Sequence, residues 1–218
     1  MARQTKERAE QTRETLLDAA EDVFFRRGVA RASLEEIASV AGLTRGAVYW
    51  HFRDKLDLFL GIAERVPLPH EEMLVDLGRS IREDPLAGLE DCVASSFGSA
   101  QTGERKRIQL TVLLLRCDYV GEMAPALERQ AESYRRLVVE LQHLFRKAAG
   151  TPAATPDWPP EMAAQMFYTL IHGAVLRWLR EPDEFQLGRE GLDMIRRFLG
   201  VLRHDWFREE RSGRVSQT

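Results

Sequence analysis

The sequence lacks most of the features that would place it among disulfide-rich, fibrous or membrane-spanning proteins. Its 218 residues include two cysteines, Cys92 and Cys117, too few for a disulfide framework or a four-thiolate zinc site. Nine prolines and fifteen glycines exclude collagen-like and low-complexity chains. The longest apolar stretch without a charge, 162–176, is too short for a membrane span. Because the first residues show no apolar segment of a secretory signal, we expect a cytoplasmic protein.

An excess of charge of one sign is also missing from the chain as a whole. The formal net charge is −3, and 30% charged with 44% hydrophobic residues argues against wholesale disorder. The local distribution of charge is more informative. The segment from Thr44 to Lys55 contains three basic residues, two arginines and the lysine, and one acidic residue, Asp54. The charge therefore points to one short basic segment rather than to a basic domain.

Helical periodicity runs through almost the whole chain, whereas strand signals are nearly absent. We find neither sustained alternation of apolar and polar residues nor an Asn-Gly or Asp-Gly hairpin turn. The sequence therefore predicts an all-α protein. The expected helices are one that ends before Gly28 and others at about 34–41, 45–51, 54–66, 86–97, 108–115, 127–145, 161–180 and 188–206. Prolines predict a break at 67–69 and a loop at 151–160, and a polar tail follows at 208–218.

The last two predicted helices, 161–180 and 188–206, carry wider apolar stripes than one core face needs. One interpretation is deep burial inside a single subunit. The other is two packing faces, one for the core and one for an identical partner, with Leu199 on the seam between subunits.

Residues 34–52 have the pattern of a helix-turn-helix. Ser33 is a favourable N-cap with Glu36 three residues later, as in a capping box. Gly42 stands where a short turn needs a positive φ, and the small Ala38 allows the two helices to cross closely. The positions expected to face inward are Ile37, Ala41, Leu43 and Val48. The second helix is then free to enter a major groove of DNA.

The start of that second helix carries side chains suited to reading DNA. Thr44 is expected to cap it, and the small Gly46 and Ala47 allow close approach to the bases. Arg45 can donate two hydrogen bonds to O6 and N7 of a guanine. The residues suited to phosphate groups are Tyr49, His51 and Lys55. The alanine and glycine spacing by itself fits an ordinary helical hairpin equally well.

Residues 11–60 resemble the tetracycline-repressor (TetR/AcrR) family of bacterial regulators. The resemblance is carried by the runs Phe24-Phe25-Arg26-Arg27-Gly28-Val29, Ala32-Ser33-Leu34-Glu35-Glu36-Ile37-Ala38 and Ala41-Gly42-Leu43-Thr44-Arg45-Gly46-Ala47-Val48-Tyr49-Trp50-His51-Phe52-Arg53-Asp54-Lys55. It implies an all-α homodimer, with a three-helix DNA-binding domain at 1–55 and a larger helical domain for ligand binding and dimerisation at 56–207. Beyond residue 65 only the order and length of the helices agree with the family.

The resemblance also implies which residues contact DNA. By motif position these are Ser33, Thr44, Arg45, Tyr49, His51 and Lys55, and the expected partner is double-stranded operator DNA. Trp50 either packs on the sugar-phosphate backbone or anchors the helix in the core, and the sequence leaves both open. The first residues, Ala2-Arg3-Gln4-Thr5-Lys6-Glu7, are similar to those of the branch that represses multidrug efflux pumps.

Several polar or aromatic side chains stand among apolar ones in the C-terminal part. Each of them alone fits ordinary burial, whereas together they fit the few polar groups that orient a ligand in a mostly apolar pocket. The candidate lining residues are Gln109, Leu113, Cys117, Tyr134, Tyr168, Ile171 and His172. In the multidrug-repressor branch the position that matches His172 faces the ligand cavity and is often acidic, so this chain departs from the pattern there. The expected inducer is a small hydrophobic, often aromatic compound.

Motifs for catalysis and cofactor binding are missing. The segment 98–103 has the glycine spacing of a phosphate loop, but Glu104 stands where lysine is required and no strand precedes it. The five histidines lack metal-ligand spacing, and no Gly-x-Ser-x-Gly occurs. We therefore expect no enzyme, no metal and no cofactor. The two cysteines are expected to be small buried hydrophobes, with a redox-sensing pair as the alternative.

Taken together, these features predict a repressor that binds operator DNA as a dimer and is released by a small hydrophobic compound, controlling an efflux-pump operon. One alternative is a regulator of fatty-acid or other metabolic genes. Another, from a different class, is a helical protein-interaction module without DNA binding.

Overall fold

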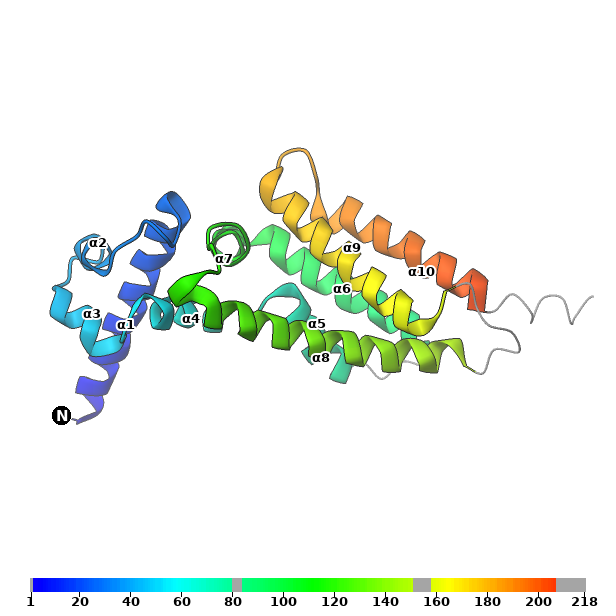
Figure 1. Ribbon diagram of the computed structural model, residues 1–218, viewed down its shortest axis with the longest axis horizontal. Helices are drawn as coiled ribbons and strands as arrows, with labels where there is room; N and C mark the ends of the chain where they lie inside the picture. Colours follow the sequence, from blue (N-terminus) through cyan, green and yellow to red (C-terminus); the bar gives the residue numbers. More distant parts are fainter. Residues whose placement is uncertain (1, 80–83, 151–157, 207–218) are drawn as a thin grey trace, which may run out of the picture. The chain divides into compact units, whose positions relative to one another are not determined.

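The computed structural model describes residues 2–79, 84–150 and 158–206, and every regular element in these ranges is helical (Figure 1). The all-α prediction is confirmed, whereas the predicted polar tail at 208–218 lies outside the described residues. The helices in chain order are α1 (Ala2–Arg27), α2 (Leu34–Val40), α3 (Arg45–His51), α4 (Lys55–Arg65), α5 (Pro69–Arg79), α6 (Pro85–Thr102), α7 (Glu104–Leu115), a 3-10 turn η1 (Gly121–Met123), α8 (Ala124–Ala149), α9 (Pro160–Arg180), a π turn η2 (Leu187–Gly191) and α10 (Leu192–Trp206). Within the described ranges no helix is both long and apolar enough to cross a membrane.

The chain forms two compact units. The first contains Met1–Leu68 and Glu104–Ala131, and the second contains Pro69–Gly103 and Glu132–Thr218. The first unit extends beyond the helix-turn-helix because α1 packs against α7 as well as against α2 and α4. The two units are defined by contacts within the chain. The predicted division into a DNA-binding domain at 1–55 and a ligand-binding domain at 56–207 stays a prediction.

Local hydrogen bonds set the ends of α2 and α3, as the sequence predicts. The hydroxyl of Ser33 accepts from the backbone N–H of Glu36 at 3.1 Å, and that of Thr44 accepts from Ala47 at 3.3 Å. Gly42 has a φ of +67°, and its N–H and that of Leu43 bond back to the last turn of α2. This arrangement is a Schellman motif, which satisfies helix carbonyls and turns the chain sharply. The turn therefore delivers α3 at a fixed angle to α2.

The core of the first unit is built on α1. Its fully buried residues include Leu16, Leu17 and Phe24, and it packs against α2 and α4, whose fully buried residues are Ile37, Leu58, Phe59 and Ile62. The fully buried Val48 belongs to α3, which packs against α2. A Cβ atom on Gly61 would lie 2.9 Å from Cδ2 of Leu17, so α4 approaches α1 too closely for a larger residue there unless Leu17 shifts. The position of α4 is thus tightly defined by α1.

The second unit contains elements that the sequence did not predict. Prolines at 67 and 69 were expected only to end the preceding helix, but α5 begins at Pro69, because proline is preorganised for the first turn of a helix. The last predicted helix starts instead as the π turn η2 and continues as α10.

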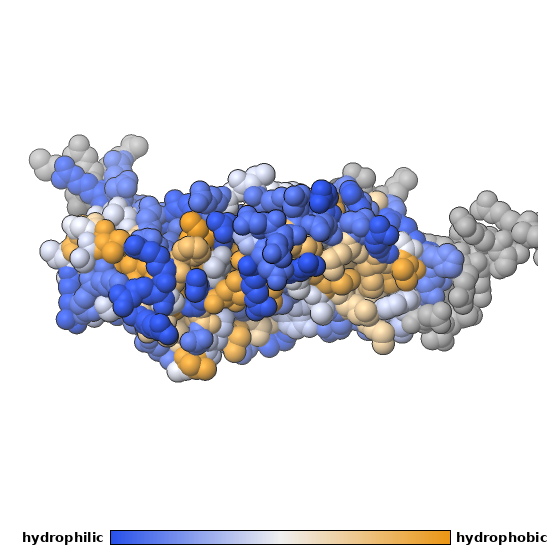
Figure 2. All heavy atoms as spheres, turned by 90° about the horizontal axis from the view of Figure 1, so that it is seen from above, coloured by the Kyte–Doolittle hydropathy of each residue, from blue (hydrophilic) through white to orange (hydrophobic). Residues whose placement is uncertain are grey.

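Helices α9 and α10 have one buried face and one exposed apolar face. Figure 2 shows apolar patches among hydrophilic residues on one side of the molecule. The exposed apolar residues of the two helices are Met162, Met166, Met194 and Val201. Leu199, which we predicted on a seam between subunits, is fully buried in the core of the second unit. That placement was wrong, because α10 turns Leu199 inward and Val201 outward.

Candidate functional site

Helix α3 is anchored by one side chain and exposed on its other sides. Val48 is fully buried, whereas Thr44, Arg45, Gly46 and Tyr49 are exposed. Ala47 is half-buried, one residue before the anchor. The N-terminal half of α3 therefore presents small and polar groups to the surroundings, as a helix that enters a DNA groove requires.

The guanidinium of Arg45 is held on two sides. Its Nε lies 3.0 Å from a carboxylate oxygen of Glu35 on α2, and its Nη2 donates to the hydroxyl of Tyr49 at 3.3 Å. The Cζ atom also lies 5.3 Å from the centre of the Tyr49 ring. The hydrogen bond with Tyr49 and the charge of Glu35 raise the pKa of Arg45, so the group stays positively charged.

The aromatic residues at the end of α3 differ in exposure. Trp50 is 71% exposed, which excludes the interpretation that it anchors the helix in the core. The rings of Trp50 and His51 pack edge to face, with 4.4 Å between their centroids. Burial, together with the nearby charge of Arg13, lowers the pKa of His51 and favours its neutral imidazole, which still carries one N–H donor for a phosphate.

Lys55 already has oxygen partners in this structure. Only 15% of its side chain is exposed, and its Nζ lies 3.0 Å from a carboxylate oxygen of Glu122 and donates to the carbonyl of Ala32 at 3.4 Å. A phosphate would therefore have to share Lys55 with Glu122, and the phosphate-binding role of Lys55 stays a prediction. Glu122 was not predicted as a partner of Lys55, because the two residues are far apart in the chain.

Three of the candidate ligand-binding residues come together in the second unit. The rings of Tyr134 and Tyr168 lie 4.4 Å apart, and that of Tyr168 stacks on His172 at 5.6 Å with 12° between the planes. The hydroxyl of Tyr134 donates to the side-chain carbonyl of Gln165 at 2.6 Å. Burial lowers the pKa of His172 and so favours its neutral imidazole. Such a surface suits aromatic, neutral compounds.

The other candidate ligand-binding residues are not part of this stack. Ile171 is buried beside it on α9, whereas Gln109, Leu113 and Cys117 belong to the first unit. The amide of Gln109 is buried and donates to Glu21 at 2.6 Å, so it already has a protein partner. Burial raises the pKa of Cys117 to about 11, which keeps it a thiol at pH 7.

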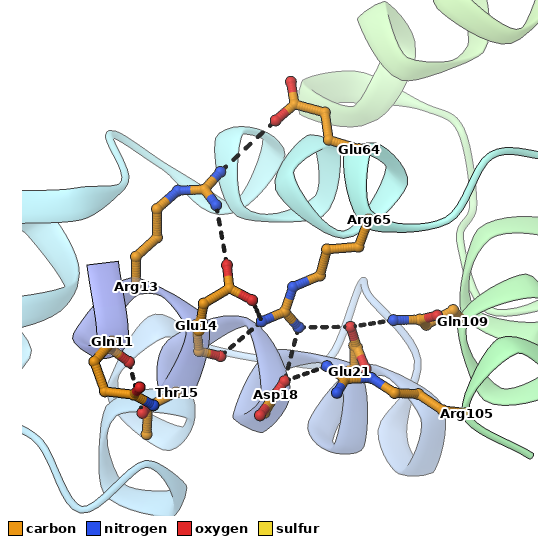
Figure 3. A network of polar contacts seen from close by, with 10 residues as sticks. All are labelled: Gln11, Arg13, Glu14, Thr15, Asp18, Glu21, Glu64, Arg65, Arg105 and Gln109. Atoms are coloured by element: carbon orange, nitrogen blue, oxygen red, sulfur yellow. Dashed lines mark hydrogen bonds and ion pairs between the residues drawn. The ribbon is translucent and has the colours of Figure 1, made fainter. Parts of the chain in front are cut away.

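A network of charged side chains in the first unit was not predicted from the sequence (Figure 3). Arg65, the last residue of α4, reaches three acidic residues of α1: its Nη1 lies 2.8 Å from Asp18 and 2.7 Å from Glu21, and its Nη2 lies 2.5 Å from Glu14. Arg105 of α7 also pairs with Asp18 and Glu21. The network therefore joins the end of α4 to α1 and α7.

This network is largely buried at its centre. Arg65 is 12% exposed and Glu21 is buried, and hydrogen bonds to Glu21 and Glu14 raise the pKa of Arg65 although burial alone lowers it. Within the described residues, Nε of Arg65 is the buried side-chain nitrogen or oxygen left without a partner. The ranges that the structure describes hold no group of three His, Cys, Asp or Glu side chains suited to a metal ion.

An all-helical chain with an exposed, polar recognition helix after a tight turn has the architecture of a helix-turn-helix regulator. Comparison with known families supports this class. Residues 16–62 match the family of bacterial regulatory proteins called tetR, and residues 87–203 match the C-terminal domain of BetI-type transcriptional repressors. The chain belongs to the TetR family of transcriptional regulators.

Individual relatives match almost the whole chain. The transcriptional repressor BepR of Brucella suis is 37% identical over 201 residues, covering 92% of this chain and 96% of BepR. The structure of NalD from Pseudomonas aeruginosa, the secondary repressor of the MexAB-OprM multidrug efflux pump, matches with a TM-score of 0.76 and 35% identity, covering 87% of this chain and 97% of NalD. The complex of triclosan with SmeT, the repressor of a Stenotrophomonas maltophilia multidrug efflux pump, matches with a TM-score of 0.73 and 32% identity over 88% of this chain and 91% of SmeT.

Proposed function

We propose that this protein is a cytoplasmic, dimeric repressor of a multidrug efflux operon and that a small hydrophobic compound releases it from its operator. The observation that carries the proposal is the exposed face of α3 with Arg45, Tyr49 and Trp50, in a chain that is 37% identical to the repressor BepR over nearly its full length. The efflux operon is suggested by NalD and SmeT, which are described as repressors of such pumps.

DNA binding is the first part of the proposal to test. The two α3 helices of a dimer would enter successive major grooves, with the phosphate backbone fixing their register. Fluorescence anisotropy with the DNA upstream of the protein's own gene measures this binding against unrelated DNA of equal length. Equal affinity for both fragments would refute the repressor and favour the interaction module.

Release by an inducer requires different affinities for two conformations rather than tight binding alone. A shift from mostly DNA-competent to mostly incompetent dimers needs a difference of about 5 kcal/mol between the states. Helix α4 is suited to carry the signal, because it begins beside the recognition helix and its last residue, Arg65, precedes the second unit in the chain by four positions.

The aromatic stack gives a prediction for inducer binding. Tyr168→Ala and His172→Ala are each expected to weaken binding by about 1 kcal/mol or more, because each removes a ring from the stack. Calorimetry with triclosan as the probe measures this, and anisotropy should show unchanged operator binding without ligand. His143→Ala, an exposed histidine on α8, is the control. If both variants bind triclosan, and any other dye or drug tested by calorimetry, with the affinity of the wild type, the inducer site lies elsewhere. Binding of acyl-CoA alone would indicate a metabolic regulator.

The exposed apolar face of α9 and α10 gives a prediction for assembly. Val201→Glu is expected to convert a dimer into monomers, because a carboxylate would be buried without a partner at the subunit interface. Val139→Glu on α8 is the matched control, since the two valines are 48% and 46% exposed. Sedimentation velocity at micromolar concentration measures the state. A monomeric wild type, or dimers with both variants, would contradict the proposed interface.

A further inference from the structure

We propose that Glu35 is a specificity-determining residue that positions Arg45 for a guanine and opposes binding to other DNA. The inference rests on the proposed DNA-binding function of α3. It starts from the ion pair between Glu35, in the first turn of α2, and Arg45, the first residue of α3. This pair crosses the turn of the helix-turn-helix on its exposed side.

The contacts of Arg45 select which edge of its guanidinium is available. An arginine has five N–H donors, one on Nε and two on each Nη. The carboxylate of Glu35 lies 3.0 Å from Nε as an ion-pair partner, and the hydroxyl of Tyr49 accepts one donor from Nη2. One N–H on Nη2 and both on Nη1 are left by these contacts, and the pair of Nη atoms matches O6 and N7 of a guanine. Glu35 therefore orients the two Nη atoms of the guanidinium before DNA binds.

The same carboxylate acts against DNA that offers no guanine at this position. Phosphates repel a negative charge, and the Glu35 side chain is 52% exposed next to the face that would meet DNA. Where Arg45 binds a guanine, the guanidinium stays between the carboxylate and the base and the repulsion is offset. Where it does not, the repulsion remains, which lowers affinity for nonspecific sequences.

Glu36 provides a matched control for Glu35. It is the next residue in the first turn of α2, but its carboxylate pairs with Arg27 at 2.8 Å instead of with Arg45. Glu36→Gln thus removes the same charge from the same helix turn and leaves the contacts of Arg45 in place. A general effect of negative charge near DNA would change both variants alike.

The experiment uses the full-length protein and measures anisotropy with the operator, with operators substituted at each base pair, and with unrelated DNA. Glu35→Gln is expected to reduce discrimination at the base pair that Arg45 reads by about tenfold, within the range for one bidentate contact. It is also expected to tighten binding to unrelated DNA by about threefold, whereas Glu36→Gln changes discrimination by less than about twofold. In the background of Arg45→Ala, Glu35→Gln should no longer change discrimination.

Three results would overturn the inference. The first is equal behaviour of Glu35→Gln and Glu36→Gln. The second is a loss of discrimination at a base pair other than the one that Arg45 reads, which would mean that Glu35 contacts a base directly. The third is an unchanged effect of Glu35→Gln in the Arg45→Ala background. Failure of the proposed function is separate, since it shows as a wild type that does not prefer the operator to unrelated DNA.

Discussion

Replacing Arg45 with alanine is expected to weaken operator binding by about 1–3 kcal/mol for each subunit, and by about twice that for a dimer that uses both copies. The structure places this guanidinium at the exposed start of α3, oriented by Glu35 and Tyr49. Its loss removes hydrogen bonds to base edges, so the preference at the base pair that it reads should relax. Anisotropy with single-base-pair substitutions of the operator measures both effects.

Lys55→Ala is the contrasting variant. If Lys55 binds a phosphate, its loss weakens binding to all sequences and reduces the salt dependence by about one phosphate for each subunit. The pairing of Lys55 with Glu122 requires a thermal-unfolding measurement beside the binding assay, because the variant also loses a contact within the first unit. For comparison, if Arg45→Ala lowered the binding affinity for every DNA sequence equally, as is expected of Lys55→Ala, Arg45 would not read a base.

The second large effect is expected for Arg65. Arg65→Met should lower the free energy of unfolding by about 3 kcal/mol, because it leaves the buried Glu21 without its closest cation. Arg105→Met is the matched control, since Arg105 pairs with two of the three carboxylates that Arg65 contacts, Asp18 and Glu21, but is 58% exposed. Its loss should cost about 0.5 kcal/mol. Urea unfolding measures both values.

Arg65 also offers a test of how the inducer signal reaches α3. The network fixes the C-terminal end of α4 against α1 and α7, so its loss should loosen the link between ligand binding and operator release. Arg65→Met is expected to bind both ligand and operator but to need more ligand for release, in an operator-release titration below the unfolding temperature. Equal stability losses for Arg65→Met and Arg105→Met, or normal release by Arg65→Met, would contradict this role of the buried network.

The sequence by itself determined the elements whose causes are local. The caps at Ser33 and Thr44 and the turn at Gly42 depend on residues three to five positions away, so spacing and residue type were enough to predict them. The small residues after Thr44 and the basic Arg45 likewise marked the recognition helix. The helix-turn-helix pattern also predicted that Val48 faces inward, because the helical period sets which side of α3 meets the core, and Val48 is fully buried.

Tertiary structure alone decided the contacts between distant segments. Arg65 meets Glu14, which lies 51 positions earlier, and Gln109 meets Glu21, which lies 88 positions earlier. The two-faced pattern of α10 did not say whether Leu199 or Val201 faces the core, because both belong to a wide apolar stripe. Likewise, an aromatic residue such as Trp50 suits either a core or a surface. The choice depends on which helix packs on which face, and only the folded chain fixes that packing.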